Sequence, residues 1–324
     1  MFNSLFDVGC SGLKISRRRG IITHWDIDGL ASAVILSKML NPERKILSSV
    51  NSVARYIGEL VSLGLNEIWI ADLNPASSMK NQLNMTLERA RRLGVKLYWF
   101  DHHQWFHDMM SLFNQYSEVI SFVNEPSMVA SHIVANYFGV GGNEYYRKLV
   151  SLAYDDDFFE NRFEITRIYR RVLKWDGWDI KYRILESLLQ GELEPRWLIE
   201  YYVNEVKNVY ENLMREAIGR MEVVEKNGAR LLIFPDVDPR VHPGELIEVV
   251  EKQGLLAHAY IVRYPRGISL RSDYVDVSKI ASLYGGGGHP RVAGIPGGVG
   301  MEAVLKSLLD AFEKHGVDRP LYIA

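Results

Sequence analysis

The feature that most constrains the fold is a regular alternation of short apolar runs and amphipathic segments in the first half of the chain. Runs typical of buried β-strands occur at residues 21–23, 45–50, 67–73, 96–100 and 119–123. Patterns typical of helices lie between or after them, at residues 30–40, 53–63, 77–93, 127–138 and 144–153. This alternation predicts an α/β unit with a parallel sheet and crossover helices.

The second half of the chain is organised differently. Between about residues 160 and 226 only helical patterns occur, and residues 195–226 could form one long helix. Strands are then predicted at 229–235, 258–264 and 267–271, and helices at 245–252, 277–282 and 301–314. A tight turn at Pro265-Arg266-Gly267 makes two of these strands compatible with antiparallel pairing. We therefore expect three parts: an α/β domain at 1–160, a helical connector at 161–226 and a smaller mixed α/β domain at 227–324.

Composition narrows the classes of function. The 324 residues carry 38 Lys and Arg against 40 Asp and Glu, a formal net charge of −2, so no general basicity demands a long polyanion as partner. The single cysteine, Cys10, excludes an internal disulfide and fits a reducing compartment, so we expect a cytoplasmic protein. Residues 1–15 lack the pattern of a signal peptide. No uncharged apolar run reaches the roughly 20 residues that span a bilayer, so no membrane partner is expected.

Acidic and imidazole side chains follow several of the predicted strands, at the point where each strand ends. In an extended segment, alternate side chains share a face, so three potential ligands after the first strand would point one way. Because the carboxyl ends of parallel strands meet at one edge of a sheet, the groups after different strands are expected to converge. These groups are His24, Asp26 and Asp28, then Asp72, then Asp101, His102 and His103.

So many acids at one sheet edge would repel one another unless cations neutralise them. Two divalent ions about 3.5–4 Å apart form a clamp suited to phosphoryl displacement. A set of carboxylates and imidazoles without thiolate suits Mn²⁺, with Mg²⁺, Co²⁺ or iron as lesser candidates. Taken singly, each cluster has a simpler interpretation as an acidic loop, a helix cap or a solvated helix end, and the run Asp155-Asp156-Asp157 is such a case. Their occurrence in strand order favours a metal site.

The complete set resembles the motifs of the DHH phosphoesterase superfamily. The matching residues are His24-Trp25-Asp26-Ile27-Asp28-Gly29 with Ser32, then Asp72, then Asp101-His102-His103, then Asp155. Near the C-terminus, Gly285-Gly286-Gly287-Gly288-His289-Pro290-Arg291 with Ala293-Gly294 is similar to the signature of the DHH-associated C-terminal domain. The two signatures together cover most of the chain. The family includes RecJ-type single-strand exonucleases, nanoRNases and cyclic-dinucleotide phosphodiesterases.

The resemblance implies a dinuclear manganese centre in the first domain. It assigns His24 and Asp26 to one ion, Asp28, His102 and Asp155 to the other, and Asp72 to both. Asp155 is preferred for the last position because the aromatic Phe159 follows it, but Asp156 and Asp157 stay open as alternatives. The resemblance also places His103 against the scissile phosphate and gives Asp101 the task of orienting an imidazole.

For the C-terminal domain the resemblance implies substrate binding. Four consecutive glycines permit backbone N–H groups to form an anion-binding concavity, and basic side chains beside them add donors. Arg271 resembles the arginine that precedes this signature and would hold a nucleotide phosphate. The expected substrate-binding residues are Arg271, Gly286, Gly287, Gly288, His289 and Arg291. Trp25 and Trp105 flank the expected site and could either stack on bases or pack in the core.

The function expected from these inferences is hydrolysis of short single-stranded RNA or DNA to mononucleotides by a manganese-dependent phosphodiesterase. A RecJ-like exonuclease of repair or replication is the alternative, followed by a cyclic-dinucleotide or 3′-phosphoadenosine phosphatase. A non-catalytic replication scaffold is the rival from a different class. A homodimer and contacts with replication or repair proteins are further possible partners.

Overall fold

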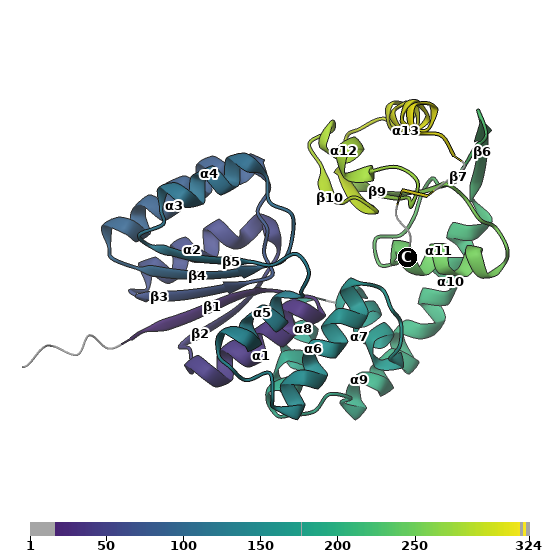
Figure 1. Ribbon diagram of the computed structural model, residues 1–324. Helices are drawn as coiled ribbons and strands as arrows, with labels where there is room; N and C mark the ends of the chain where they lie inside the picture. Colours follow the sequence, from purple (N-terminus) through teal and green to yellow (C-terminus); the bar gives the residue numbers. More distant parts are fainter. Residues whose placement is uncertain (1–16, 176, 318–319, 322–324) are drawn as a thin grey trace, which may run out of the picture.

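The protein folds into two α/β units joined by helices (Figure 1). The structure is a computed structural model, which describes residues 17–175, 177–317 and 320–321. Cys10 and the segment 1–15, on which the expectations about disulfides and a signal peptide depend, lie outside the described residues. Within the described part of the chain, no helix is long and apolar enough to cross a membrane.

The first unit is built on a five-stranded sheet in the order β2-β1-β3-β4-β5, and every pair of neighbours is parallel. This confirms the predicted α/β fold with a parallel sheet. Branched and aromatic side chains fill the strands because both faces of the sheet are covered by helices. The strands are β1 (Arg19–His24), β2 (Arg44–Ser48), β3 (Glu67–Ala71), β4 (Lys96–Asp101) and β5 (Ile120–Asn124).

Two layers of helices enclose this sheet (Figure 1). One face packs on α1 (Ile27–Leu40), α5 (Ala130–Tyr137) and α6 (Glu144–Asp157), around buried side chains that include Leu30, Val34 and Phe100. The other face packs on α2 (Val53–Ser62), α3 (Lys80–Arg92) and α4 (His107–Gln115), around Ile57, Leu83 and Trp99. Helix α4 had no counterpart in the sequence prediction. Short 3-10 turns, η1 (Val50–Ser52) and η2 (Ser77–Met79), precede α2 and α3.

A helical segment joins the two units, as predicted, but its end differs from the prediction. It comprises α7 (Glu164–Trp175), α8 (Trp178–Leu189), α9 (Arg196–Tyr201), the π-helical turn η3 (Tyr202–Val206) and α10 (Lys207–Gly219). The prediction of one helix over 195–226 was wrong beyond Gly219, because Glu222–Lys226 is strand β6. Asn227 and Gly228 both have positive φ, so they form the tight turn that pairs β6 with β7.

The second unit contains a mixed six-stranded sheet in the order β10-β11-β9-β8-β7-β6. Only β7 and β8 pair in parallel, and α11 (Pro243–Lys252) lies between them in the chain. One face packs on α12 (Val277–Ser282) and α13 (Met301–His315), while Leu232, Phe234 and Val262 of the other face belong to a buried cluster that also contains residues of α11, of the connecting helices and of the first unit. The remaining strands are β7 (Ala229–Phe234), β8 (Ala259–Tyr264), β9 (Gly267–Arg271), β10 (Gly287–His289) and β11 (Val292–Pro296).

Candidate metal centre

Three neighbouring strands deliver acidic and imidazole side chains to one edge of the first sheet. His24 is the last residue of β1, Asp72 follows β3 directly, and Asp101 ends β4 before His102 and His103. Because β1, β3 and β4 are adjacent and parallel, these side chains meet as expected from strand order.

Asp26 and Asp28 reach the same edge from the start of helix α1. Asp26 caps the helix, since its Oδ1 accepts the N–H of Gly29 at 3.0 Å. Asp28 lies in the first helical turn, so the expected alternation of residues 24, 26 and 28 along one extended segment was wrong. Glycine is needed at 29 because a Cβ there would lie 2.1 Å from the carbonyl oxygen of His24. The close approach of strand end and helix start brings Asp26 Oδ2 to 2.6 Å from His24 Nδ1, while Asp28 Oδ2 lies 3.9 Å from His102 Nε2.

Asp72 has an unusual backbone and an unpartnered side-chain oxygen. Its φ of 59° lies in the left-handed region, which costs an ordinary L-residue about 1–2 kcal/mol. Its amide donates to the carbonyl of Phe100 at 3.0 Å, which holds it beside β4. The side chain is nearly fully buried, yet its Oδ2 has no hydrogen-bond partner among the described residues. Strain and an orphaned acceptor at one residue indicate a functional position.

The potential ligands form three overlapping groups, and within each group one ligand atom per residue lies within 4.8 Å of the others. Asp72 belongs to two groups: its Oδ2 lies 3.7 Å from His24 Nδ1, and its Oδ1 lies 3.6 Å from His102 Nε2. The two oxygens of this carboxylate therefore face two different ligand sets. The groups are His24, Asp26 and Asp72; Asp28, His102 and Asp157; and Asp72, His102 and His103.

The end of helix α6 contributes Asp157, not Asp155, to this arrangement. Asp157 Oδ2 lies 3.4 Å from His102 Nε2, and the side chain is 19% exposed. Asp155 is fully buried, and its carboxylate accepts the backbone N–H groups of Arg162 at 2.6 Å and Phe163 at 3.3 Å. Two positions on a helix differ by about 200° around its axis, so the two side chains leave α6 on opposite faces. Of the three aspartates that the sequence left open, Asp157 is the one that lies with Asp28 and His102 in a group of potential ligands.

The electrostatics of the cluster favour bound cations. Burial, together with the neighbouring charges of Asp26 and Asp28, raises the pKa of Asp72 well above its usual range. Burial and the same two carboxylates also raise the pKa of Asp157 well above its usual range. Burial lowers the pKa of His102, and His103 adds to this, so the ring is neutral and able to bind a metal at neutral pH. Together with the orphaned oxygen of Asp72, these residues fit divalent cations.

His103 and Asp101 form a separate pair beside the cluster. Asp101 Oδ1 accepts from His103 Nδ1 at 3.0 Å, and its Oδ2 accepts from the indole N–H of Trp105. Burial acts to lower the pKa of His103, but Asp101 outweighs this and raises it. Trp105 packs against Trp99, Phe113 and Phe122, so it orients Asp101 and is part of the core.

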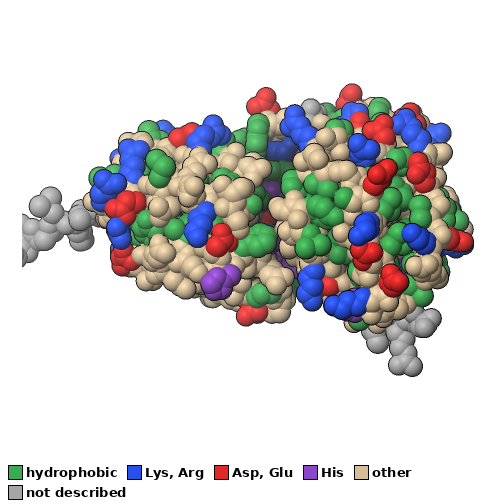
Figure 2. Space-filling model, turned by 90° about the horizontal axis from the view of Figure 1, so that it is seen from above, with side chains coloured by type: hydrophobic (Ala, Val, Ile, Leu, Met, Phe, Trp, Pro, Cys, Tyr) green, Lys and Arg blue, Asp and Glu red, His purple; other side chains and the backbone are tan. Residues whose placement is uncertain are grey.

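A cavity of about 1250 Å³ lies between the two units, and the metal-ligand cluster is at one part of its wall. From above, the surface is hollowed between the two halves of the molecule and histidine side chains are visible in the hollow (Figure 2). The first unit contributes His24, Trp25, Asp26, His102 and Asp157 to the lining; the second contributes Arg271, His289 and Arg291.

The glycine run 285–288 was expected to form an anion-binding loop, but its last residues are part of a β-hairpin. Residues 287–289 form β10 and pair with β11, and Gly286, Gly287 and Gly288 do not line the cavity. Gly288 has φ 143°, and a Cβ there would lie 2.5 Å from the carbonyl oxygen of Val292, so glycine allows the hairpin to close tightly. The hairpin places His289 with its ring 6.0 Å from that of His103. The run therefore positions His289 across from the metal-ligand cluster.

Other cavity-lining residues were missed from the sequence. Arg170 and Lys174 of α7, Phe159, and His242 before α11 all line it. The spacing of four between Arg170 and Lys174, which puts both on one helix face, was the available signal. Nothing in the sequence indicated that this face turns toward the second unit.

Comparison with known proteins finds solved structures with a similar fold. No family model matches the sequence, and no curated protein matches it. A solved structure described as the DHH domain of a member of a ribosomal protein family aligns with TM-score 0.61 at 18% identity, over 94% of this chain and 87% of the other. The pGpG-specific phosphodiesterase PggH from Vibrio cholerae aligns with TM-score 0.51 at 12% identity, over 92% and 100%.

RecJ from Thermus thermophilus, solved in complex with Mn²⁺, aligns with TM-score 0.53 at 14% identity. The alignment covers 94% of this chain but 52% of RecJ, so about half of that enzyme has no counterpart here. All three alignments extend through both sheets and the helices between them. The chain therefore has the same α/β fold as these solved structures, one of which is described as a DHH domain.

Proposed function

We propose that the protein is a divalent-metal-dependent phosphodiesterase that hydrolyses short single-stranded oligonucleotides to mononucleotides. The observation that carries the proposal is that members of the carboxylate and imidazole cluster and basic side chains of the second unit line the same cavity. A phosphodiester in this cavity would meet cation-binding groups on one side and phosphate-binding groups on the other. The fold of known phosphodiesterases supports this proposal.

The metal ligands proposed are two sets that share Asp72. His24 and Asp26 would serve one ion, and Asp28, His102 and Asp157 the other, with Asp157 in place of the Asp155 preferred from sequence. Bound divalent cations supply Lewis-acid chemistry, which acidifies water and neutralises charge that develops on phosphoryl oxygens. Oxygen and imidazole ligands without thiolate favour Mn²⁺, with Mg²⁺ and Co²⁺ as substitutes.

His103 is the proposed proton donor. Its Nδ1 donates to Asp101, which leaves Nε2 as the free nitrogen of the ring. Because Asp101 favours the protonated form, Nε2–H can donate to a phosphoryl oxygen or to the departing sugar oxygen. The indole of Trp105 holds the other oxygen of Asp101, so the imidazole keeps one orientation.

The second unit is proposed to hold the substrate phosphates. His289 lines the cavity with its ring 6.0 Å from that of His103, and Arg271 and Arg291 line the same cavity. Guanidinium groups bind phosphate oxygens through charge-assisted hydrogen bonds. The net charge of −2 leaves little general attraction for long strands, for which phosphate contacts dominate affinity. These features favour oligonucleotides of a few residues.

Digestion of end-labelled RNA and DNA oligomers of two to twenty nucleotides tests the proposal. We expect Mn²⁺-dependent release of mononucleotides, fastest for dimers to pentamers, and loss of at least about a hundredfold in rate for Asp72→Asn and His102→Ala. Asp310→Asn, an exposed carboxylate on α13, is the matched control and should keep full activity. Faster digestion of long strands would instead support the RecJ-like alternative. Absence of hydrolysis with any divalent metal would support a non-catalytic scaffold.

A further inference from the structure

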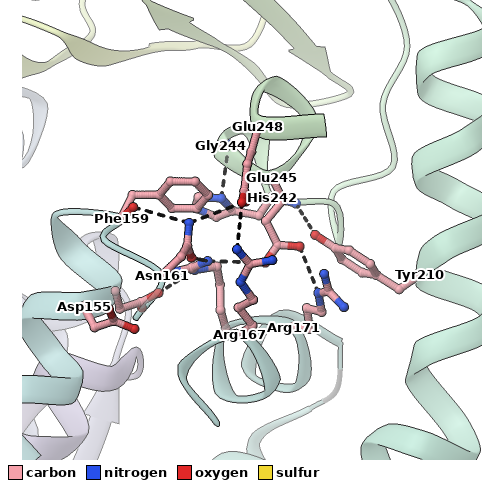
Figure 3. Close-up of polar contacts among 12 residues, drawn as sticks. Asp155, Phe159, Asn161, Arg167, Arg171, Tyr210, His242, Gly244, Glu245 and Glu248 are labelled. Atoms are coloured by element: carbon pink, nitrogen blue, oxygen red, sulfur yellow. Dashed lines mark hydrogen bonds and ion pairs between the residues drawn. The ribbon is translucent and has the colours of Figure 1, made fainter. Parts of the chain in front are cut away.

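A second group of charged residues lies in the same cavity, apart from the metal-ligand cluster. It combines Arg170 and Lys174 of α7 with Arg271 of β9 and with His242, which caps α11. These residues come from the connector and from the second unit, so the group forms only when the two pack together. Figure 3 shows its surroundings, with side chains of α7 facing those of α11.

The acidic side chains around this group are already paired. Arg170 donates from Nε to Asp156 at 2.5 Å, and from Nη1 to Asn161 at 2.9 Å and Glu245 at 3.3 Å. Glu245 also accepts from Arg171 at 2.9 Å. Arg167 pairs with Glu248 at 2.7 Å (Figure 3). These contacts hold α7 against α11. They also pair the nearby carboxylates with Arg167, Arg170 and Arg171.

Lys174 and Arg271 have no carboxylate partner, and one N–H group of Arg170 has no hydrogen-bond acceptor, among the residues that the structure describes. Within the described part of the chain, neither Lys174 nor Arg271 has a carboxylate within 4.0 Å. The Nη2 of Arg170, a side chain only 3% exposed, and the Nε of Arg271 are buried without a hydrogen-bond partner among the described residues. Burying unpaired cationic donors is costly, so such a set indicates an anion that fills the space.

The titration behaviour agrees with this surplus of positive charge. Burial lowers the pKa of Lys174 to about 8, although Asp156 and Glu245 act in the opposite direction. Burial also lowers the pKa of Arg271 to about 10. His242 accepts the N–H of Gly244 on Nδ1 at 3.1 Å, so its neutral ring carries the proton on Nε2 and is a further donor.

We infer that Lys174, Arg271 and Arg170 form an anion site that binds a terminal phosphate monoester of the oligonucleotide substrate. This inference rests on the proposed function. Two surplus cations match the charge of about −1.5 to −2 that a phosphate monoester carries at neutral pH, and its three oxygens can accept the unpartnered donors. An internal phosphodiester carries a single charge and matches the set less well.

The end of helix α6 connects this site to the metal-ligand cluster. Asp156 accepts from Arg170, while the next residue, Asp157, lies against His102. One helical turn thus presents neighbouring carboxylates to the two sites. A substrate held by its terminal phosphate at the anion site would place a nearby diester at the metal-ligand cluster, and this arrangement would favour the short substrates proposed above.

The test compares dinucleotides that carry a 5′-phosphate, a 3′-phosphate or neither, each with a methylene group in place of the bridging oxygen to prevent hydrolysis. Their affinities for the Mn²⁺-loaded protein are measured by titration calorimetry. One phosphorylated form is expected to bind about 10- to 100-fold more tightly than the form without terminal phosphate, the effect of one or two charge-assisted hydrogen bonds. Lys174→Met should reduce that difference to less than about threefold and leave the affinity for the unphosphorylated form unchanged.

Lys306→Met, at an exposed position on α13, is the matched control and should keep the full preference. Methionine is close to lysine in length and removes an unpaired, partly buried charge, so the Lys174 variant is expected to fold and its thermal midpoint is checked. Equal affinities for all three dinucleotides, or an unchanged preference in Lys174→Met, would overturn the inference. If the preference depends on Lys174 but hydrolysable dinucleotides are not cleaved with Mn²⁺, the anion site stands and the proposed function falls.

Discussion

Asp155 and Asp157 lie two positions apart on α6, and their replacement by asparagine should change stability in opposite directions. Asp155→Asn removes a buried carboxylate that accepts two backbone N–H groups. Asp157→Asn removes one of the carboxylates that repel one another in the metal-ligand cluster. In metal-free protein the first variant should be less stable than the wild type, and the second should be more stable.

The geometry sets the size of both effects. Asparagine at 155 keeps one acceptor oxygen but turns an amide donor toward a backbone N–H, which costs about 2 kcal/mol. Ligand atoms of Asp157 and Asp28 lie within 4.8 Å of one another. At that separation two unit charges repel by about 3 kcal/mol with an effective dielectric constant of about 20. Because protonation and the 19% exposure of Asp157 relieve part of this, we expect a gain of about 1–2 kcal/mol.

Urea unfolding at pH 7.5 with a chelator measures both differences, and repeating it with Mn²⁺ tests their meaning. Manganese should stabilise the wild type and Asp155→Asn by similar amounts, because both keep all the proposed ligands. It should stabilise Asp157→Asn much less. Replacing a residue that only hydrogen-bonds to a metal ligand typically weakens metal binding by roughly 10- to 100-fold, and loss of a ligand itself should weaken it at least as much. The assignment of Asp157 would be refuted if Asp155→Asn lost the manganese effect and Asp157→Asn retained it.

Three further predictions concern the cavity. Lys174→Met should be more stable than the wild type at pH 7. This difference in the free energy of unfolding should shrink by about 1 kcal/mol per pH unit between about pH 8 and pH 10. The reason is that the folded protein releases the Lys174 proton at a lower pH than the unfolded chain does. Paired urea titrations measure it, and an advantage that does not change with pH would contradict the unpaired buried charge. His103→Ala should lower kcat by about 10²–10⁴-fold with manganese affinity nearly unchanged, and a large loss of affinity would make His103 a ligand instead. Gly288→Ala should destabilise the protein by about 1–3 kcal/mol and raise KM, because it strains the hairpin that carries His289; an unchanged KM would remove the hairpin from substrate binding.

The acidic and imidazole side chains at the ends of the strands were predictable from the sequence, because their positions follow from the local pattern of apolar and polar residues. Apolar runs mark β1, β3 and β4, and parallel neighbours must bring Asp72 and His102 to the same edge. The groups after these strands do meet, and two of the resulting ligand groups share Asp72. The succession of apolar runs, each followed by acidic or imidazole residues, was therefore enough to predict most of the fold and of the ligand cluster of the first unit.

Features that depend on exact backbone geometry were predicted less well. Asp28 faces the cluster from a helix, because the chain turns at Asp26 and not after Asp28. Asp155 and Asp157 are both plausible ligands by sequence, and only the contact of Asp155 with the backbone N–H groups of Arg162 and Phe163 separates them. In the same way the glycine run is a strand because Gly288 closes on Val292, a contact that no local pattern reveals.

The contacts between the two units could not be predicted from one sequence. Arg170 and Arg171 meet Glu245 from a distant part of the chain, and each of these charges alone has the pattern of a solvated helix face. Arg271 was singled out by resemblance, but its neighbours Arg170 and Lys174 were not. Their common location appears only when α7 and β9 are packed against the same cavity.

The most direct test of the account is a crystal structure of the protein soaked in Mn²⁺, with the ions located by their anomalous scattering. We predict two peaks that share Asp72, one also bound by His24 and Asp26 and the other by Asp28, His102 and Asp157. A single peak away from Asp72, or no peak at this edge of the sheet, would contradict the proposed centre.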